Sequence, residues 1–523
     1  MESVKHVHKK YASTSKVGSD WKNIYVISTF AFVDALQFAF FVWTFWPYVQ
    51  QLDPSISASF IGLIMAVSGV GEAVAAPILG FWTNRTGVVV PPLVASVVMS
   101  IVGNIIYMSL NEVPVPLRKY GLLVSRFLNG AGSGNRGTFF AYIAAASEPS
   151  DRFRSMALSG GGALIGLNVG PAVQMLFTWI GSEGIDIKFM RISMYTAPAL
   201  LALAINLACV FLLVFFLDDG LDRFNGPDSD SISTYSIAAA EDSDLEKCSV
   251  KTIRMDVVAV CVCMWTRAAR MLITANVESI GSPFSQVMFG LDNKQVLNYN
   301  AMMQGAVGAL TVVMLLIYVF TPYSKWISER LNCTIAMIAL LFFHLLTYSW
   351  PFLEGQLPGC AKFMDTENGT GQGWSWCESL RPINFWLYYI SYPLIFGLAL
   401  PCLNNSLQSL FSQVLGKGRQ GTMQGVNQAV GCISRICGPL LMSTTFSNFG
   451  PRATWLIEIV LIAVCLFIWL GVYRRLMPAV EVKQRKITVA TCGTVNSAFR
   501  KSSNSTEISE LDSANTTVSK QLT

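Results

Sequence analysis

The chain has 523 residues, of which 52% are hydrophobic and 13% charged, with a formal net charge of +5. Soluble domains usually carry about 25% charged residues, so these charges are too few to cover a soluble protein of this length. The apolar residues come in blocks of roughly 20, which is enough to cross about 30 Å of hydrocarbon as a helix. The composition excludes a soluble enzyme and predicts an all-α polytopic membrane protein.

The first 22 residues are polar and include five lysines and two histidines. They lack the short apolar core and the small-residue cleavage site of a secretory signal peptide. We therefore expect the first apolar helix to target the chain and to remain in the membrane. Membrane orientation explains the basic residues more simply than nucleic-acid binding does.

Twelve apolar segments follow, and each is predicted to be a helix because a backbone in hydrocarbon must satisfy its own hydrogen bonds. They cover residues 24–47, 58–80, 89–110, 120–143, 155–179, 192–217, 254–279, 298–320, 333–353, 383–411, 421–444 and 453–473. A polar, serine-rich stretch divides them six and six. The predicted organisation is a tail (1–22), a six-helix bundle (23–217), a disordered linker (218–252), a second bundle (253–476) with a long loop (354–382), and a disordered tail (477–523).

The basic residues predict the orientation. With both tails in the cytoplasm, that side collects 21 lysines and arginines and the opposite side eight. This bias is the positive-inside pattern. Loop 354–382 then lies outside the cytoplasm, where its sequon at Asn368 is expected to be glycosylated. Cys360 and Cys377 share this loop, and we expect a disulfide between them, the alternative being two free thiols.

Three short motifs resemble the signatures of the major facilitator superfamily. Gly80-Phe-Trp-Thr-Asn84-Arg85-Thr-Gly87 resembles its cytoplasmic loop motif G-x-x-x-D-R-x-G, except that Asn84 replaces an aspartate. This exchange removes a charge expected to pair with neighbouring helix ends. Leu122 to Gly132 and Gly162 to Pro171 resemble the motifs of the fourth and fifth helices, the latter through Gly166, Gly170 and Pro171. Gly438-Pro439 in the eleventh span repeats Gly170-Pro171, as expected for two parallel six-helix repeats.

A narrower resemblance covers residues 20–480. The segments Trp46–Pro54, Gly132–Asn135, Met194–Pro198 and Ser434–Pro439 resemble the lysosomal neuronal ceroid lipofuscinosis type seven family, also called the major facilitator domain-containing eight family. This resemblance implies an integral protein of lysosomal and endosomal membranes with a chloride conductance. The acidic dileucine sorting signal of many members is absent from the amino-terminal tail.

Charged residues inside spans are costly and usually face the interior of a bundle. In the seventh span Arg267, Arg270, Thr274 and Glu278 lie three or four residues apart, so they form one stripe of a helix. The family resemblance places this helix beside the central path, and arginines in a pore favour anions. The alternative is that Arg267 and Arg270 pair with Glu72 or Asp34 and only lock helices together.

Other spans offer further polar candidates for the transport path. They are Asp34 and Gln37 in the first span, Arg126 and Arg136 in the fourth, and Arg435 in the eleventh. Asp34 is the best candidate for a proton carrier or an arginine counter-ion. For Arg126, capping and packing of the fourth span is a nearly equal alternative, and for Arg435 a structural role is slightly favoured because Gly438-Pro439 follows it. His344 in the ninth span is expected to be a satisfied buried histidine. Glu458 is a further carboxylate within a span.

The sequence contains no nucleotide-binding loop, metal-binding cluster or nucleophile motif, so no cofactor or metal is expected. The leading hypothesis is an endolysosomal anion channel or ion-coupled transporter. Two alternatives stay open: a proton-coupled carrier of a small organic solute, and a scaffold or receptor that does not transport. The sequence does not fix the oligomeric state.

Overall fold

The computed structural model describes residues 18–42, 45–52, 58–181, 184–187, 190–219, 256–355, 357, 376, 380–416 and 420–477. The first half contains α2 (Trp21–Val42), α3 (Phe45–Leu52), α4 (Ala58–Thr86), α5 (Val90–Ser109), α6 (Val115–Gly132), η1 (Ser133–Asn135), α7 (Arg136–Ala146), α8 (Arg152–Met175), η2 (Thr178–Ile180), β1 (Ile185–Ile187), β2 (Met190–Ile192) and α9 (Ala197–Phe216). The second half contains α11 (Val257–Phe289), α12 (Asn293–Phe320), α13 (Tyr323–Trp326), α14 (Glu329–Leu346), α16 (Phe385–Leu415) and α17 (Gly421–Val472).

The helices account for the twelve predicted spans. Eight of the described helices are long and apolar enough to cross a membrane: α4, α5, α9, α11, α12, α14, α16 and α17. The last of these contains two spans, because Gly450 (φ 79°, ψ 178°) breaks its helical geometry. The remaining three spans are α2, the nearly continuous α6–η1–α7, and α8. The prediction of an all-α, twelve-helix membrane protein is confirmed.

Several predicted boundaries were wrong, each for a local reason. The ninth span ends at Leu346 instead of residue 353, ahead of Pro351, whose ring in a continued helix would clash with the carbonyl group of Thr347. The seventh continues to Phe289, where Gly290 adopts a left-handed conformation (φ 64°) and ends it. The sixth begins at Ala197, because Ile185–Ile187 and Met190–Ile192 form a short antiparallel hairpin that the sequence reading missed.

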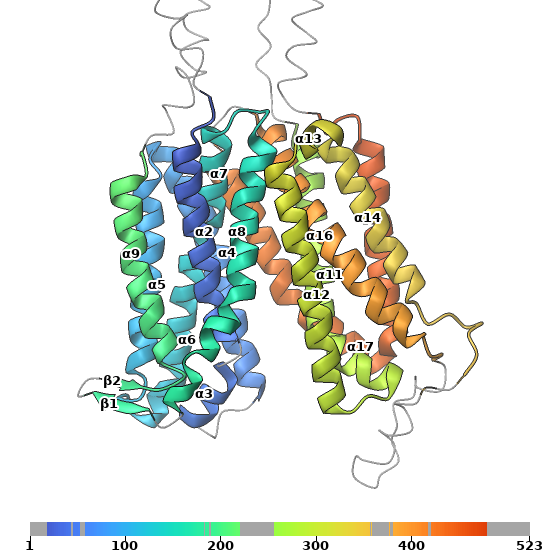
Figure 1. Cartoon of the computed structure of the whole chain (residues 1–523), viewed down its shortest axis with the longest axis horizontal. Helices are drawn as coiled ribbons and strands as arrows, with labels where there is room; N and C mark the ends of the chain where they lie inside the picture. The colour runs from blue at the N-terminus through green and yellow to red at the C-terminus, as the bar shows by residue number, and fades with distance from the viewer. Residues whose placement is uncertain are drawn as a thin grey trace, which may run out of the picture.

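The two halves form separate bundles, the first drawn blue to green and the second yellow to red (Figure 1). They lie against each other at the end that carries α13 and diverge toward the end that carries β1 and β2. The contact between α4 and α17 joins the halves, with further contacts between α7 and α17 and between α8 and α12. At the joined end the ring of Phe153 packs edge-on against Tyr318, with centroids 5.2 Å apart.

Candidate functional site

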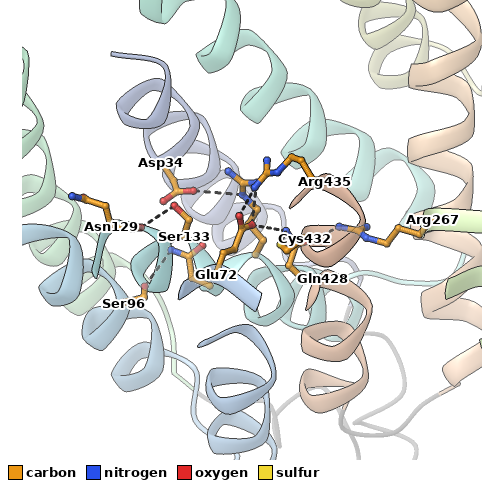
Figure 2. Close-up of polar contacts among 11 residues, drawn as sticks. Asp34, Glu72, Ser96, Asn129, Ser133, Arg267, Gln428, Cys432 and Arg435 are labelled. Carbon is orange, nitrogen blue, oxygen red and sulfur yellow. Dashed lines mark hydrogen bonds and ion pairs between the residues drawn. The ribbon is translucent and has the colours of Figure 1, made fainter. Parts of the chain in front are cut away.

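A buried network of charged and amide side chains joins the two halves, and Glu72 of α4 is its centre. One oxygen of this carboxylate, Oε2, lies 2.5 Å from Nη2 of Arg435 on α17. The other, Oε1, lies 3.4 Å from Nη1 of Arg136 on α7 and accepts a hydrogen bond of 2.8 Å from Nε2 of Gln428 on α17. Figure 2 shows Glu72 between Arg435 and Gln428. Only 4% of the Glu72 side chain is exposed, so each partner contributes to holding its charge.

Arg136 also reaches the first helix of the bundle. Its Nε lies 3.7 Å from Oδ2 of Asp34 on α2, so its guanidinium lies between two carboxylates from different helices. Asp34, Glu72, Arg136 and Arg435 therefore form one charge cluster that connects α2, α4 and α7 to α17. The first-half members are brought together because α7 packs against both α2 and α4.

Arg267 of α11 enters the network through amides instead of carboxylates. Its Nη2 donates to Oε1 of Gln428, and its Nη1 donates to Oε1 of Gln408 on α16 at 3.3 Å. Figure 2 shows Arg267 on the far side of Gln428 from Glu72. Gln428 thus uses its amide oxygen for Arg267 and its amide nitrogen for Glu72, which fixes the orientation of the amide. The Gln408 amide nitrogen continues the network to Oε1 of Gln424 at 2.8 Å.

The charges in this network do not balance. It contains three guanidinium groups (Arg136, Arg267 and Arg435) and two carboxylates (Asp34 and Glu72). Within the described part of the chain, Arg267 has no carboxylate within 4 Å, and it is only 7% exposed. A buried charge without a counter-ion is costly, so the surplus positive charge makes this site attractive to an anion.

The remaining predicted path residues lie outside this network. Gln37 is partly buried on α2, and Arg126 of α6 is buried with its guanidinium 5.1 Å from the ring centroid of Tyr107. Arg270 is buried on α11 and its Nη2 donates to the sulfur of Met271 at 3.5 Å. The side chain of Glu278 lies outside the described residues. Among the described residues, Glu72 and Asp34 form their ion pairs with Arg136 and Arg435, and neither Arg267 nor Arg270 takes part in these pairs.

The sequence reading missed the role of Glu72 as the centre and that of the glutamines as bridges. The sequence offers one indication that Glu72 is important, because it is a carboxylate in an otherwise apolar span. Gln424, Gln428 and Arg435 lie on one stripe of a helix, but the stripe does not reveal that its partner is α4. That pairing depends on how the two halves dock.

The loop motif that resembles a family signature also joins the halves. Oδ1 of Asn84, at the end of α4, accepts a hydrogen bond of 2.7 Å from the backbone nitrogen of Gly421, and its Nδ2 donates to Oγ1 of Thr422 at 2.9 Å. Gly421 begins α17, and the first backbone N–H groups of a helix have no partner within it. The neutral amide therefore still binds a neighbouring helix end, although it lacks the expected charge. Arg85 is exposed, and Gly87 adopts a positive φ of 72° where the loop turns.

Backbones of the two halves touch near this motif. A Cβ atom on Gly425 would lie 2.3 Å from the carbonyl oxygen of Ala76, and one on Gly80 would lie 2.2 Å from that of Gly421. Such distances are far below any real contact of a Cβ atom. The closed end thus requires glycine at these positions.

Replacing Gly425 with valine is expected to separate the halves at this end, because the side chain would overlap the α4 backbone. Spin labels on cysteines introduced at the exposed positions Arg85 and Lys325 would report a longer distance between the halves. Gly471→Val is the matched control, since no atom lies within 4 Å of a Cβ at that position of the same helix. An unchanged distance in the Gly425 variant would contradict this role.

The glycines of the fifth-helix signature and of its repeat in the eleventh span pack the helices that carry the charges. Cβ atoms on Gly166 and Gly170 of α8 would lie 2.3 Å from the Phe32 oxygen and 2.2 Å from the Ala39 Cβ of α2. A Cβ on Gly438 of α17 would lie 3.0 Å from that of Ala275 on α11. Pro439 follows within α17, and the side chain of Pro171 lies outside the described residues. These close contacts set the positions of the helices that carry Asp34 and Arg267.

Comparison with known proteins identifies the family that has this architecture. A family model described as Major Facilitator Superfamily matches residues 27–361. The major facilitator superfamily domain-containing protein 8 of Xenopus laevis is 28% identical over 499 residues, which cover 90% of this chain and 95% of the relative. The human organic anion transporter MFSD10 (TETRAN) has a similar structure, with a TM-score of 0.58 at 14% identity, over 86% of this chain and 99% of that one. The proton:xylose symporter XylE also matches, with a TM-score of 0.58 at 13% identity, over 87% and 96%. The chain belongs to the Major Facilitator Superfamily.

Proposed function

We propose that this membrane transport protein moves a small anion such as chloride across endolysosomal membranes. The observation that carries the proposal is the surplus positive charge of Arg267, buried where the two halves meet. Its guanidinium is held by the amides of Gln408 and Gln428, so its hydrogen-bonding groups are oriented, while no carboxylate of the described residues forms an ion pair with it. Fixed cationic groups in a dry path attract anions and exclude cations.

The contacts around Arg267 also suggest how anion binding would couple to movement. Gln428 links Arg267 to Glu72, and Glu72 holds Arg435 and Arg136. An anion beside Arg267 would compete with the Gln428 amide oxygen and weaken the connection between the halves. Alternating access in this fold is a rocking of one half against the other, so a ligand that loosens this connection would change its equilibrium.

The proposed orientation has both termini in the cytoplasm, as the distribution of lysine and arginine predicts. The joined end, which carries Asn84 and Gly421, is then cytoplasmic, and the described conformation is closed on that side. The loop 354–382 is lumenal in this orientation. Its predicted glycosylation site, Asn368, and its predicted disulfide, Cys360–Cys377, lie outside the described residues. The endolysosomal location is supported by resemblance to a lysosomal family.

Patch-clamp recording from enlarged endolysosomes with ion substitution tests this proposal. We expect a current that follows the chloride gradient and disappears when gluconate replaces chloride on both sides. A current that follows the cation gradient, or none above that of cells lacking the protein, would contradict an anion conductance. A chloride-dependent flux that saturates and is too slow to resolve as current would identify a carrier instead of a channel.

A proton-coupled carrier of a small organic solute is the second candidate, and Asp34 is the observation that favours it. Its carboxylate is held by Arg136 at 3.7 Å, a longer contact than either of the ion pairs of Glu72. A carboxylate inside a membrane span that an arginine holds only weakly is suited to take up a proton during transport. Uptake that requires a pH gradient and is lost in Asp34→Asn would favour this candidate.

A further inference from the structure

A second buried charge pair lies within the second half, away from the network around Glu72. His344 is on α14, and Glu458 is on the part of α17 that follows the break at Gly450. Nε2 of the imidazole lies 2.8 Å from Oε2 of the carboxylate, and their side chains are 0% and 1% exposed. Neither carboxylate oxygen of Glu458 has another hydrogen-bond partner among the described residues, so the imidazole is the polar group that this buried carboxyl faces.

The hydrogen bonds of the ring determine where its protons lie. Nδ1 of His344 is 2.7 Å from the carbonyl oxygen of Leu340. A carbonyl oxygen can only accept, so Nδ1 carries a hydrogen. The contact between Nε2 and Glu458 then needs one more hydrogen, either on the carboxyl group or on the ring. Without it, two lone pairs would face each other at 2.8 Å and a bare carboxylate would be buried.

The surroundings offer no substitute for this proton. The rings of Phe343, Phe396 and Trp455 lie 5.2, 6.3 and 6.5 Å from the imidazole. Tyr388 and Tyr392 of α16 are the titratable side chains on the facing helix, and a phenol ordinarily carries no charge at physiological pH. From α11, Phe284 stacks on Trp455. Among the described residues, no lysine or arginine forms an ion pair with Glu458.

We propose that His344 and Glu458 form a proton-binding site that retains one shared proton and thereby fastens α14 to α17. The residues that directly follow α14 are also joined to α17, by hydrogen bonds from Trp455 Nε1 to Thr347 Oγ1 (3.0 Å) and from Arg452 Nε to the Ser349 carbonyl oxygen (3.1 Å). The pair uses none of the residues around Arg267, so it stands independently of the proposed anion transport.

The site makes stability depend on pH with a definite sign. In the native state the pair holds one proton. In an unfolded chain exposed to water, a histidine side chain ordinarily titrates near pH 6.5 and a glutamate side chain near pH 4.3. Between about pH 4.3 and 6.5 the native state and the separated state each hold one proton, so the stability contributed by this site does not depend on pH there. Above about pH 6.5 the separated state releases it, and the unfolding equilibrium constant rises about tenfold per pH unit.

Glu458→Gln tests the shared proton. The glutamine amide can donate to Nε2 of a neutral imidazole, which keeps the contact but removes the need for a proton. The ratio of the unfolding constants of the variant and the wild type should then fall about tenfold per pH unit from pH 5 to pH 8, because all other titrations cancel. In thermal unfolding of the two purified proteins, the midpoint temperature of the wild type should rise relative to that of the variant as the pH falls. A gap in midpoint temperature that stays constant over this range would overturn the proposal.

A double variant, His344→Leu with Glu458→Leu, keeps the test valid if the glutamine variant does not fold. It removes both partners, so no polar group is left unpaired. Relative to it, the wild type should keep a constant stability below about pH 6.5 and lose stability above that value. A wild type that loses nothing relative to the double variant between pH 6.5 and 8 would also overturn the shared proton.

Discussion

Arg267→Gln is expected to lower the chloride current at least tenfold without damaging the fold. Glutamine can still hydrogen-bond to Gln408 and Gln428, but it removes the surplus positive charge that attracts the anion. Because an uncompensated buried charge is costly, the thermal stability of the variant should equal or exceed that of the wild type. Loss of current with preserved stability would separate a transport role from a structural one.

Three further variants sharpen this result. Arg267→Lys keeps the charge and should retain a current, with altered selectivity because lysine cannot reproduce the planar guanidinium. The double variant with Arg270→Gln should have no more current than Arg267→Gln alone. Lys325→Gln removes an exposed positive charge and should leave the current unchanged. Wild-type current in a correctly folded Arg267 and Arg270 double variant would contradict the assignment.

Glu72→Gln is expected to destabilise the protein by about 3–5 kcal/mol, the usual cost of removing one partner from a buried ion pair. Arg435 and Arg136 would lose their shared carboxylate, and the surplus positive charge of the network would rise. Thermal unfolding of the detergent-purified protein measures the effect. Glu72→Asp, which keeps the charge on a shorter side chain, is the matched control and should lose less.

A second substitution tests whether this cost arises from the pairing between halves. Arg435→Gln added to Glu72→Gln removes the unpaired guanidinium and should recover part of the lost stability. The recovery is limited, since 34% of the Arg435 side chain is exposed and water already screens its charge. Additive losses from the two substitutions would show that Glu72 and Arg435 do not interact.

Most of the fold could be predicted from the sequence because hydrocarbon imposes a simple requirement. Long apolar blocks must form helices, and this predicts the number of spans and their division into two halves. The ends of spans were less predictable, since they depend on local features such as the left-handed Gly290 and the strand pairing of Ile185 with Ile192. The sequence stays apolar across such features, so its composition does not indicate where a span ends.

The candidate site could be predicted only in part. The intramembrane positions of Asp34, Arg136, Arg267 and Arg435 were evident from the sequence, because charges stand out in apolar spans. Their partners were not, since Glu72 and Arg435 are separated by 363 residues and meet only when the halves dock. The bridging role of the glutamines could not be predicted either, because an uncharged amide in a helix can equally line a transport path or hydrogen-bond to a neighbouring helix.

The most direct test of the central claim is chloride flux into liposomes that contain only the purified protein. We expect a flux that depends on the chloride gradient and is at least tenfold slower in liposomes containing Arg267→Gln. Equal flux through the wild type and the Arg267 variant, or no flux above that of protein-free liposomes, would contradict the claim that the buried charge of Arg267 serves an anion path.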